Sequence, residues 1–347
     1  MSSSQSERTP LIDRSGLPLP IGSSQVQDHP IFLRACHSPW PWLGQSGLVY
    51  IRGLILAYLT ALSGMLLDYK IKYEYGEDEE KTAWCTLFEF STVAFVLLWL
   101  YHFIVFFWSF THLFYPDIEE EDQRWESTVI KKLSPPVQTP QSRKRFYFSV
   151  FFTIVHVFAI MNCVIYWTVL VPLGYGKFPG AGGGDGGDDG DAGEGGEESA
   201  SITSAEDFFG DYWFQPYCLI NLYCITGLIA IFEILVLNSI KRQVPVGSHI
   251  FFVAFVLSAY LGWAAFGKLF TGEYPFFWMD REEVEKTEYI ASYVSGFVSL
   301  GLTVFAFIYG LIGMRENLCD KGSQGQSPSQ PSQNSRQVLL AEEQSPE

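Results

Sequence analysis

The chain has 347 residues, of which 48% are hydrophobic, 16% aromatic and 17% charged, and its mean hydropathy is +0.13. Apolar blocks alternate with charged segments, which is typical of a multi-pass membrane protein and argues against a soluble core. The net charge is −16, and no basic stripe is present that could neutralise phosphates, so nucleic acid is excluded as a partner.

The N-terminal residues 1–47 are rich in Ser, Pro and Gln, and we predict a disordered tail. Within this tail Glu7 stands four residues before Leu11 and Ile12, which is the form of an acidic di-leucine sorting signal read by cytosolic adaptors. This motif predicts delivery to endosomal or vacuolar membranes. The first 30 residues are polar, so we expect no cleavable signal peptide.

Six apolar stretches reach the length of about 20 residues that a membrane helix needs. We predict an all-α transmembrane domain over 48–314, with spans at about 49–67, 86–110, 146–172, 213–238, 250–269 and 289–314. The fourth stretch would form a helix roughly 39 Å long and contains a single carboxylate, that of Glu233. Residues 315–347 are rich in Ser, Gln and Pro and are predicted to be a second disordered tail.

The loop over 174–211 has a centre made almost entirely of Gly, Asp and Glu. Such a composition cannot build a core and lacks the spacing of an EF-hand, so we expect a solvated acidic linker. Six spans place both termini on one side of the membrane. Most Lys and Arg residues lie in the tails and in the second and fourth loops, which predicts that this side is cytosolic.

Ionisable residues inside spans are the default functional candidates of a membrane protein, because an unpaired charge there is costly. Glu89 and Lys268 fall near the lumenal ends of their spans, and we expect them to form an ion pair. Arg52 lies one turn inside the first span, from which its side chain can reach the interface.

Two histidines fall inside the second and third spans. His102 and His156 are expected at a common level on the cytosolic side of the midplane, with Glu233 somewhat further out. A histidine beside a carboxylate can act as a general base or a proton relay. Alternatively, all three side chains are held by hydrogen bonds between packed helices. The six cysteines show no zinc spacing, and we expect no metal or cofactor.

Short motifs in the second half resemble a known family. They are Phe232-Glu233-Ile234, Tyr260-Leu261-Gly262, Gly272-Glu273-Tyr274-Pro275-Phe276 and Asp280, together with Trp84 and Tyr166-Trp167 in the first half. The pattern over about 48–314 is similar to the fungal branch of the androgen-induced membrane protein family and to the rolling-stone proteins of insects. The resemblance implies a six-helix bundle and, in characterised members, intramembrane hydrolysis of fatty acid esters of hydroxy fatty acids.

In that family a threonine near the start of the second span is the nucleophile, and a histidine in the fourth span assists it. The resemblance therefore assigns the nucleophile to Thr86 or Thr92, whereas the histidine position is occupied by Tyr223. A threonine hydroxyl needs an adjacent base, and tyrosine is a poor base at neutral pH.

Three functions follow as expectations. The first is a divergent, non-catalytic member of this lipid-hydrolase family that binds lipid within the bundle. The second is a threonine hydrolase of fatty acid esters that recruits His102 or His156 as its base. The third is a transporter of protons or small solutes that uses these histidines and Glu233. The expected partners are membrane lipids, a lipid ester and sorting adaptors, and the expected location is an endomembrane: vacuole, endosome or endoplasmic reticulum.

Overall fold

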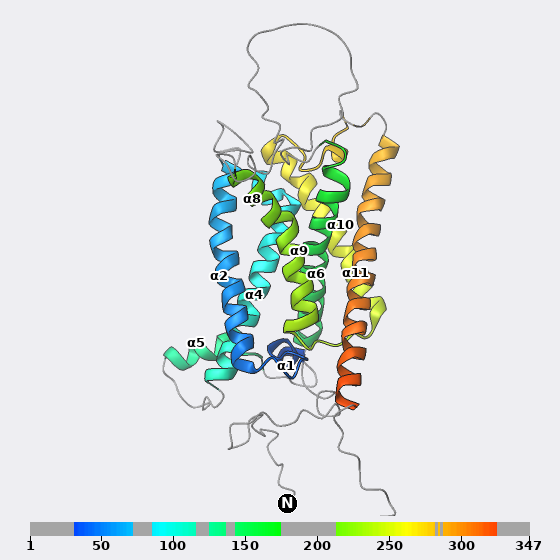
Figure 1. Cartoon of the computed structure of the whole chain (residues 1–347). Coiled ribbons are helices and arrows are strands. Elements are labelled where there is room, and N and C mark those ends of the chain that lie inside the picture. The colour runs from blue at the N-terminus through cyan, green and yellow to red at the C-terminus, as the bar shows by residue number, and fades with distance from the viewer. Residues whose placement is uncertain are drawn as a thin grey trace, which may run out of the picture.

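The computed structural model describes residues 31–71, 85–115, 125–136, 143–174, 213–281, 284 and 287–324. Six long helical segments run side by side through this part of the chain (Figure 1). They are α2 (Gln45–Tyr69), α4 (Phe90–Phe114), α6 (Lys144–Ile165) with η3 (Tyr166–Leu170), the run α8 (Phe214–Ile220), η4 (Asn221–Ile225), α9 (Thr226–Phe232) and η5 (Glu233–Leu237), then α10 (Val246–Thr271) and α11 (Thr287–Gln324). All six are long and apolar enough to cross a membrane, which confirms the prediction of an all-α polytopic bundle.

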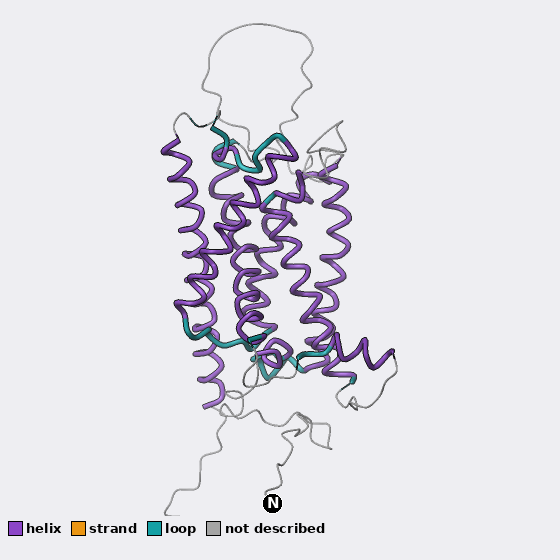
Figure 2. The backbone as a smooth tube through the Cα atoms, turned by 180° about the vertical axis from the view of Figure 1, so that it is seen from behind, coloured by secondary structure: helices purple, strands orange, loops and turns teal. Residues whose placement is uncertain are grey.

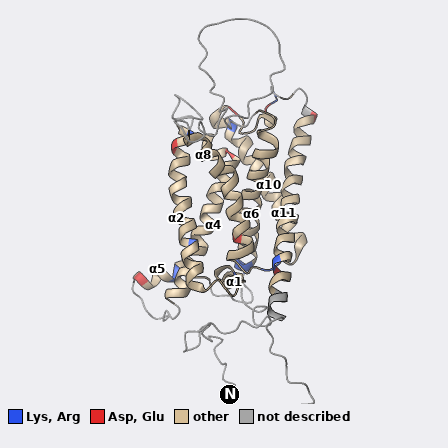
Figure 3. Ribbon diagram, in the orientation of Figure 1, with Lys and Arg blue, Asp and Glu red and all other residues tan. Residues whose placement is uncertain are grey.

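Successive long helices run in opposite directions, as the backbone trace shows (Figure 2). The short helix α1 (Ile31–Cys36) and the C-terminal end of α11 therefore lie at the same end of the bundle, which we call the α1 end. Charged residues are sparse along the middle of the helices (Figure 3). This distribution fits a hydrocarbon surrounding, because an unpaired charge is costly there. The helical form fits it as well, because the backbone of a helix satisfies its own hydrogen bonds.

Helix α6 forms the centre of the bundle. In its most apolar window 78% of the residues are buried, against 28–44% in the other five candidate spans. Helices α4, α9, α10 and α11 all pack against it. An aromatic cluster adds to this core: the ring of Phe90 on α4 lies 5.0 Å from that of Phe158 on α6, 5.0 Å from Tyr260 on α10 and 5.4 Å from Phe297 on α11.

The structure corrects both predicted tail boundaries. Residues 31–47 are not part of a disordered tail: they form α1, a connection and the first turn of α2. Phe32 of α1 is buried against the rings of Trp108 and Phe148, at 5.5 and 5.6 Å. At the other terminus α11 continues past residue 314 to Gln324. Hydropathy missed both segments because polar residues interrupt their apolar positions.

Close helix packing at the end opposite to α1 depends on Gly267. A Cβ added there would lie 2.4 Å from Cγ and 2.9 Å from Cβ of Phe88, atoms at the root of a ring that cannot swing away. We expect Gly267→Ala to lower the free energy of unfolding by about 1–3 kcal/mol through overpacking. In a denaturant titration, the control Gly262→Ala on the same helix should be neutral or stabilising by up to about 1 kcal/mol, since nothing lies within 4 Å of its added Cβ. Equal effects of the two substitutions would contradict this account.

Candidate functional site

The candidate site is built on the end of the fourth span, the π-helical turn η5. Asn238 closes this turn by donating from its backbone N (3.2 Å) and from its Nδ2 (2.8 Å) to the carbonyl of Glu233. The last carbonyls of a helix have no partner within it, and buried ones must find partners elsewhere. Here the carbonyls of residues 234–238 and 240 all accept hydrogen bonds from side chains of other segments.

The segment before α2 supplies two of these donors. They are Ser38 Oγ, which donates to the Val236 carbonyl at 2.7 Å, and Trp40 Nε1, which donates to the Leu235 carbonyl at 2.8 Å. In return, the backbone N and the Oγ of Ser239 each donate to the Arg34 carbonyl at 3.0 Å. Hydrogen bonds from the residues that precede the first span thus hold the end of the fourth span in place.

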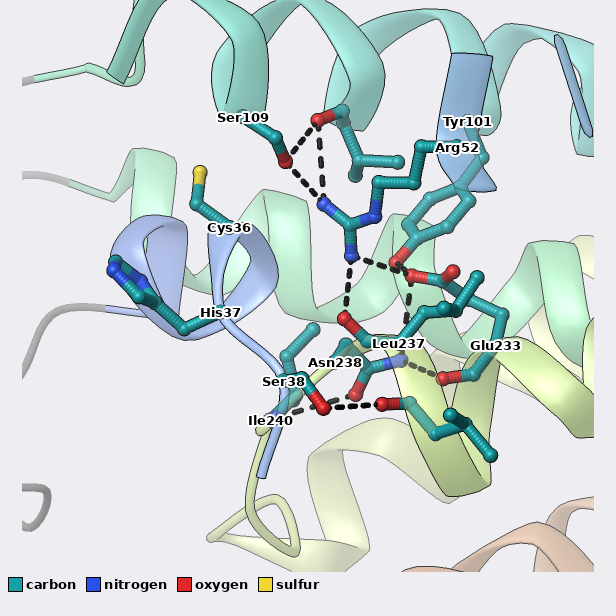
Figure 4. A network of polar contacts seen from close by, with 12 residues as sticks. Cys36, His37, Ser38, Arg52, Tyr101, Ser109, Glu233, Leu237, Asn238 and Ile240 are labelled. Carbon is teal, nitrogen blue, oxygen red and sulfur yellow. Dashed lines mark hydrogen bonds and ion pairs between the residues drawn. The ribbon is translucent and has the colours of Figure 1, made fainter. Parts of the chain in front are cut away.

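Arg52 of α2 supplies the next donors and forms a fully buried ion pair with Glu233 (Figure 4). Its Nη2 lies 3.0 Å from Glu233 Oε1 and donates to the Leu237 carbonyl at 2.8 Å. Its Nη1 donates to Ser109 Oγ and, at 3.3 Å, to the Val105 carbonyl of α4. The expectation that Arg52 reaches the interface was therefore wrong. An opposite charge in the same half of the bundle satisfies it within the protein.

Arg315 of α11 donates hydrogen bonds to the same turn from the other side. Its Nη1 donates to the Ile234 carbonyl, to the Asn238 carbonyl at 2.7 Å and to Asn238 Oδ1 at 3.0 Å, and its Nη2 donates to the Ile240 carbonyl. Arg315 is 2% exposed. Arg52 thus pairs with the Glu233 carboxylate, whereas Arg315 binds carbonyls at the helix C-terminus, whose partial negative charge helps to balance this second cation.

Tyr101 of α4 connects the ion pair to the two histidines. Its hydroxyl donates to Glu233 Oε1 at 2.9 Å, and its ring lies edge-on to that of His156 at 5.0 Å. Because a carbonyl only accepts, His156 Nδ1 donates to the Phe152 carbonyl at 2.7 Å. Among the described residues, no partner is present for His156 Nε2, either ring nitrogen of His102 or Glu233 Oε2. Neighbours within this part of the chain therefore satisfy only one ring nitrogen of His156 and one carboxylate oxygen of Glu233, and neither ring nitrogen of His102.

The thiol of Cys36 lies close to this cluster, but it is not a candidate nucleophile (Figure 4). It is fully buried, and its Sγ donates to the Phe32 carbonyl at 3.1 Å. Burial raises the pKa of Cys36 to about 12. The thiol therefore stays protonated at neutral pH, and only a thiolate is strongly nucleophilic.

The expected ion pair between Glu89 and Lys268 is not formed. Glu89 instead contacts Lys70, which follows α2, and Lys268 lies 3.6 Å from Asp280 and 4.1 Å from the ring centre of Tyr274. Glu89 and Lys268 do both lie at the end of the bundle opposite to α1, at the ends of their spans where we expected them. The depth of a residue in the membrane, estimated from its position in a span, does not determine which of several cations and anions at that depth form pairs.

The two candidate threonines are not brought to a histidine. Thr86 lies in the helical turn 85–88, and Thr92 lies in the first turn of α4 at the end opposite to α1. His102 follows Thr92 by ten residues on the same helix, which is about 15 Å, and His156 lies at the level of His102 through its contact with Tyr101. Tyr223 stacks on Tyr166 with ring centres 3.7 Å apart. The geometry therefore brings neither His102 nor His156 to Thr86 or Thr92.

Sequence reasoning also missed a serine–histidine link near the α1 end. Ser149 Oγ lies 2.8 Å from His249 Nε2, and His249 Nδ1 donates to the Pro245 carbonyl at 3.1 Å. Both side chains are buried, and the contact joins the second turn of α6 to the first turn of α10. A histidine just before the predicted fifth span was the available signal. In the described residues, no group of three or more His, Cys, Asp or Glu side chains could hold a metal ion.

An apolar groove lies beside the ion pair, on the outer face between α2 and the fourth span. It has a volume of about 290 Å³, and its lining consists of Ile51, Leu54, Ile55, Ile225, Leu228, Ile229 and Phe232. Two polar links hold its sides together: Arg52 to Glu233 at one end, and the hydroxyl of Tyr58 to Asn221 Oδ1 towards the other. The groove is therefore fixed by the fold.

No protein-family model matches the chain, and no curated protein or solved structure is significantly similar to it. The predicted sorting motif of Glu7, Leu11 and Ile12, and most of the acidic loop 174–211, lie outside the described residues.

Proposed function

We propose that this chain is a multi-pass membrane protein that binds a lipid acyl chain in the groove between α2 and the fourth span. The observation that carries the proposal is the lining of the groove, which consists of aliphatic side chains and one phenyl ring. Such a surface offers no hydrogen bond to a headgroup and selects for hydrocarbon. The resemblance to the androgen-induced membrane proteins points to the same class of ligand.

The geometry favours lipid binding over ester hydrolysis by a threonine. The candidate bases His102 and His156 lie far in level from Thr86 and Thr92, and a threonine hydroxyl needs an adjacent base to be a strong nucleophile. The groove, in contrast, is preformed, because the Arg52 and Tyr58 links join its two sides at a fixed spacing. A preformed site avoids the entropic cost of ordering its walls on binding.

The same proposal places the protein in an endomembrane with its tails in the cytosol. Three observations support it: the distribution of Lys and Arg along the chain, the exposed basic residues Arg143, Lys144 and Arg145 at the α1 end, and the di-leucine motif. Basic residues favour the cytosolic face of a membrane.

A photo-crosslinking experiment tests the proposed groove. The full chain in lipid nanodiscs is labelled with a fatty acid that carries a diazirine on its alkyl chain, and labelled peptides are mapped by mass spectrometry. We expect labelling to concentrate in 51–55 and 225–232. Leu228→Trp should displace about two methylenes, each contributing about 0.8 kcal/mol, and so weaken binding about tenfold.

The matched control is Leu67→Trp on α2, because Leu67 and Leu228 are both 54% exposed and only Leu228 lines the groove. Labelling spread evenly over all six spans, or reduced equally by both substitutions, would rule out a specific groove. Ester hydrolysis by the purified wild-type chain that disappears in Thr86→Ala or Thr92→Ala would instead establish the hydrolase.

A further inference from the structure

Helix α5 (Trp125–Leu133) stands apart from the six spans. It projects sideways from the α1 end of the bundle in both views (Figures 1 and 2). Its C-terminal end is held near α4 through Thr111 Oγ1, which donates to the Leu133 carbonyl at 3.4 Å. A helix this short is marginal in water on its own, so its surroundings must stabilise it.

The outer surface of α5 carries large apolar side chains. Trp125 is 74% exposed and Val129 is 43% exposed, and residues four apart share one face of a helix. Lys131 lies about 160° around the helix from Val129 at 3.6 residues per turn. Trp125 and Val129 therefore share one face of α5, with Lys131 on the opposite side. Lys132 lies at the edge of the apolar face.

Exposed aromatic residues mark the position of the membrane boundary at this end of the bundle. Phe114 and Tyr115 at the end of α4 are 56% and 47% exposed, and Tyr147 in the first turn of α6 is 59% exposed. Tyrosine and tryptophan concentrate at the boundary between headgroups and hydrocarbon. Since α5 is attached at the end of α4, its apolar face lies at the same level as this aromatic belt.

Charge attraction to anionic headgroups would not be enough to hold α5 at a membrane surface. Lys131 and Lys132 are exposed on α5, but acidic residues of the second loop, Glu126 and the acids within 117–122, match its basic residues in number. The hydrophobic face therefore provides the driving force, and the lysines are placed to reach the headgroups with their amines.

We propose that α5 is an interfacial helix, with Trp125 and Val129 inserted between the headgroups and the acyl chains of the bilayer that the spans cross. Its partner is a phospholipid surface. Amphipathic helices of this kind sink about 5–10 Å into that boundary. The inference depends on the six spans and is independent of the acyl-chain groove.

Depth-dependent quenching tests the inference. An amino acid that carries the NBD fluorophore is introduced by codon suppression at Trp125, Val129 or Lys131 of the full chain, which leaves the native cysteines in place. Each variant is reconstituted into phosphatidylcholine vesicles with or without lipids that carry a nitroxide on the acyl chain. We expect severalfold stronger quenching and bluer emission at positions 125 and 129 than at 131.

The probe at Val129 retains the native Trp125, so it reports insertion even if the Trp125 variant is perturbed. Adding Trp125→Ser to the chain labelled at 129 should weaken the quenching. Equal and weak quenching at all three positions, or the strongest quenching at 131, would overturn the assignment. So would quenching at 129 that appears only when a second protein is added.

Discussion

Glu233→Ala should lower the free energy of unfolding by about 3–5 kcal/mol, the cost of leaving one partner of a buried ion pair alone. The substitution leaves the fully buried guanidinium of Arg52 without its carboxylate, and it also removes the acceptor of the Tyr101 hydroxyl. The measurement is a denaturant titration of the purified protein in detergent micelles.

Two further variants show whether the charge itself is responsible. Arg52→Met leaves the Glu233 carboxylate buried and unpaired and should cost a similar amount. The double variant should cost less than the sum, because neither charge then remains alone. As a control, Glu316→Ala breaks the pair with Arg242, whose side chain is 45% exposed, and should cost only about 0–1 kcal/mol. A Glu233→Ala loss as small as this control would show that the buried pair does not stabilise the fold.

The second large effect concerns Arg315, which lies in the region that the sequence assigned to a disordered tail. Arg315→Met removes the donors to the Ile234, Asn238 and Ile240 carbonyls. Each buried acceptor left without a partner costs about 1–3 kcal/mol, so we expect a loss of at least about 3 kcal/mol. Arg315→Lys should recover only part of it, because an ammonium group lacks the planar fork that reaches several acceptors.

Hydrogen exchange gives this prediction a local readout. Peptides that cover 233–243 should exchange faster in Arg315→Met, because the turn that Arg315 holds becomes looser. Asn317→Ala is the matched control, since Asn317 is exposed two residues further along the same helix. Unchanged exchange in 233–243, together with a stability loss equal to that of the control, would contradict the role assigned to Arg315.

Both predictions concern the same turn of the fourth span, and this shared position explains their size. The π-helical turn η5 ends in extended backbone at Asn238, so its carbonyls depend on donors from α2, α11 and the segment before α2. The links hold four parts of the chain at one point. They also set the spacing between α2 and the fourth span, beside which the acyl-chain groove lies.

Part of the candidate site was visible in the sequence. Glu233 was recognised because a carboxylate inside an apolar stretch must be paired or functional. Its partner was also in view, since Arg52 has the opposite charge and was expected in the same half of the bilayer. The pairing was missed because the two residues are 181 positions apart, and nothing in either helix states which of its faces meets the other.

Ser38, Trp40 and Arg315 were missed for a different reason. They lie in polar, Ser-rich or charged surroundings that resemble disordered tails by composition. These residues are ordered because they donate hydrogen bonds to the carbonyls at the end of the fourth span. Local composition contains no information about such partners on a distant segment. The candidate threonines show the opposite error, because the family resemblance named residues that the fold does not bring to either candidate histidine. Thr92 lies about 15 Å along α4 from His102.

The sequence by itself determined the six helices and their alternating directions. Each helix needs only a continuous apolar stretch, because its backbone hydrogen bonds are made within the segment and hydrocarbon replaces water around it. The tertiary structure alone decided which charges pair, which carbonyls are capped and where the groove opens. Those outcomes depend on the rotation and spacing of helices relative to one another, which are set by packing between segments far apart in the chain.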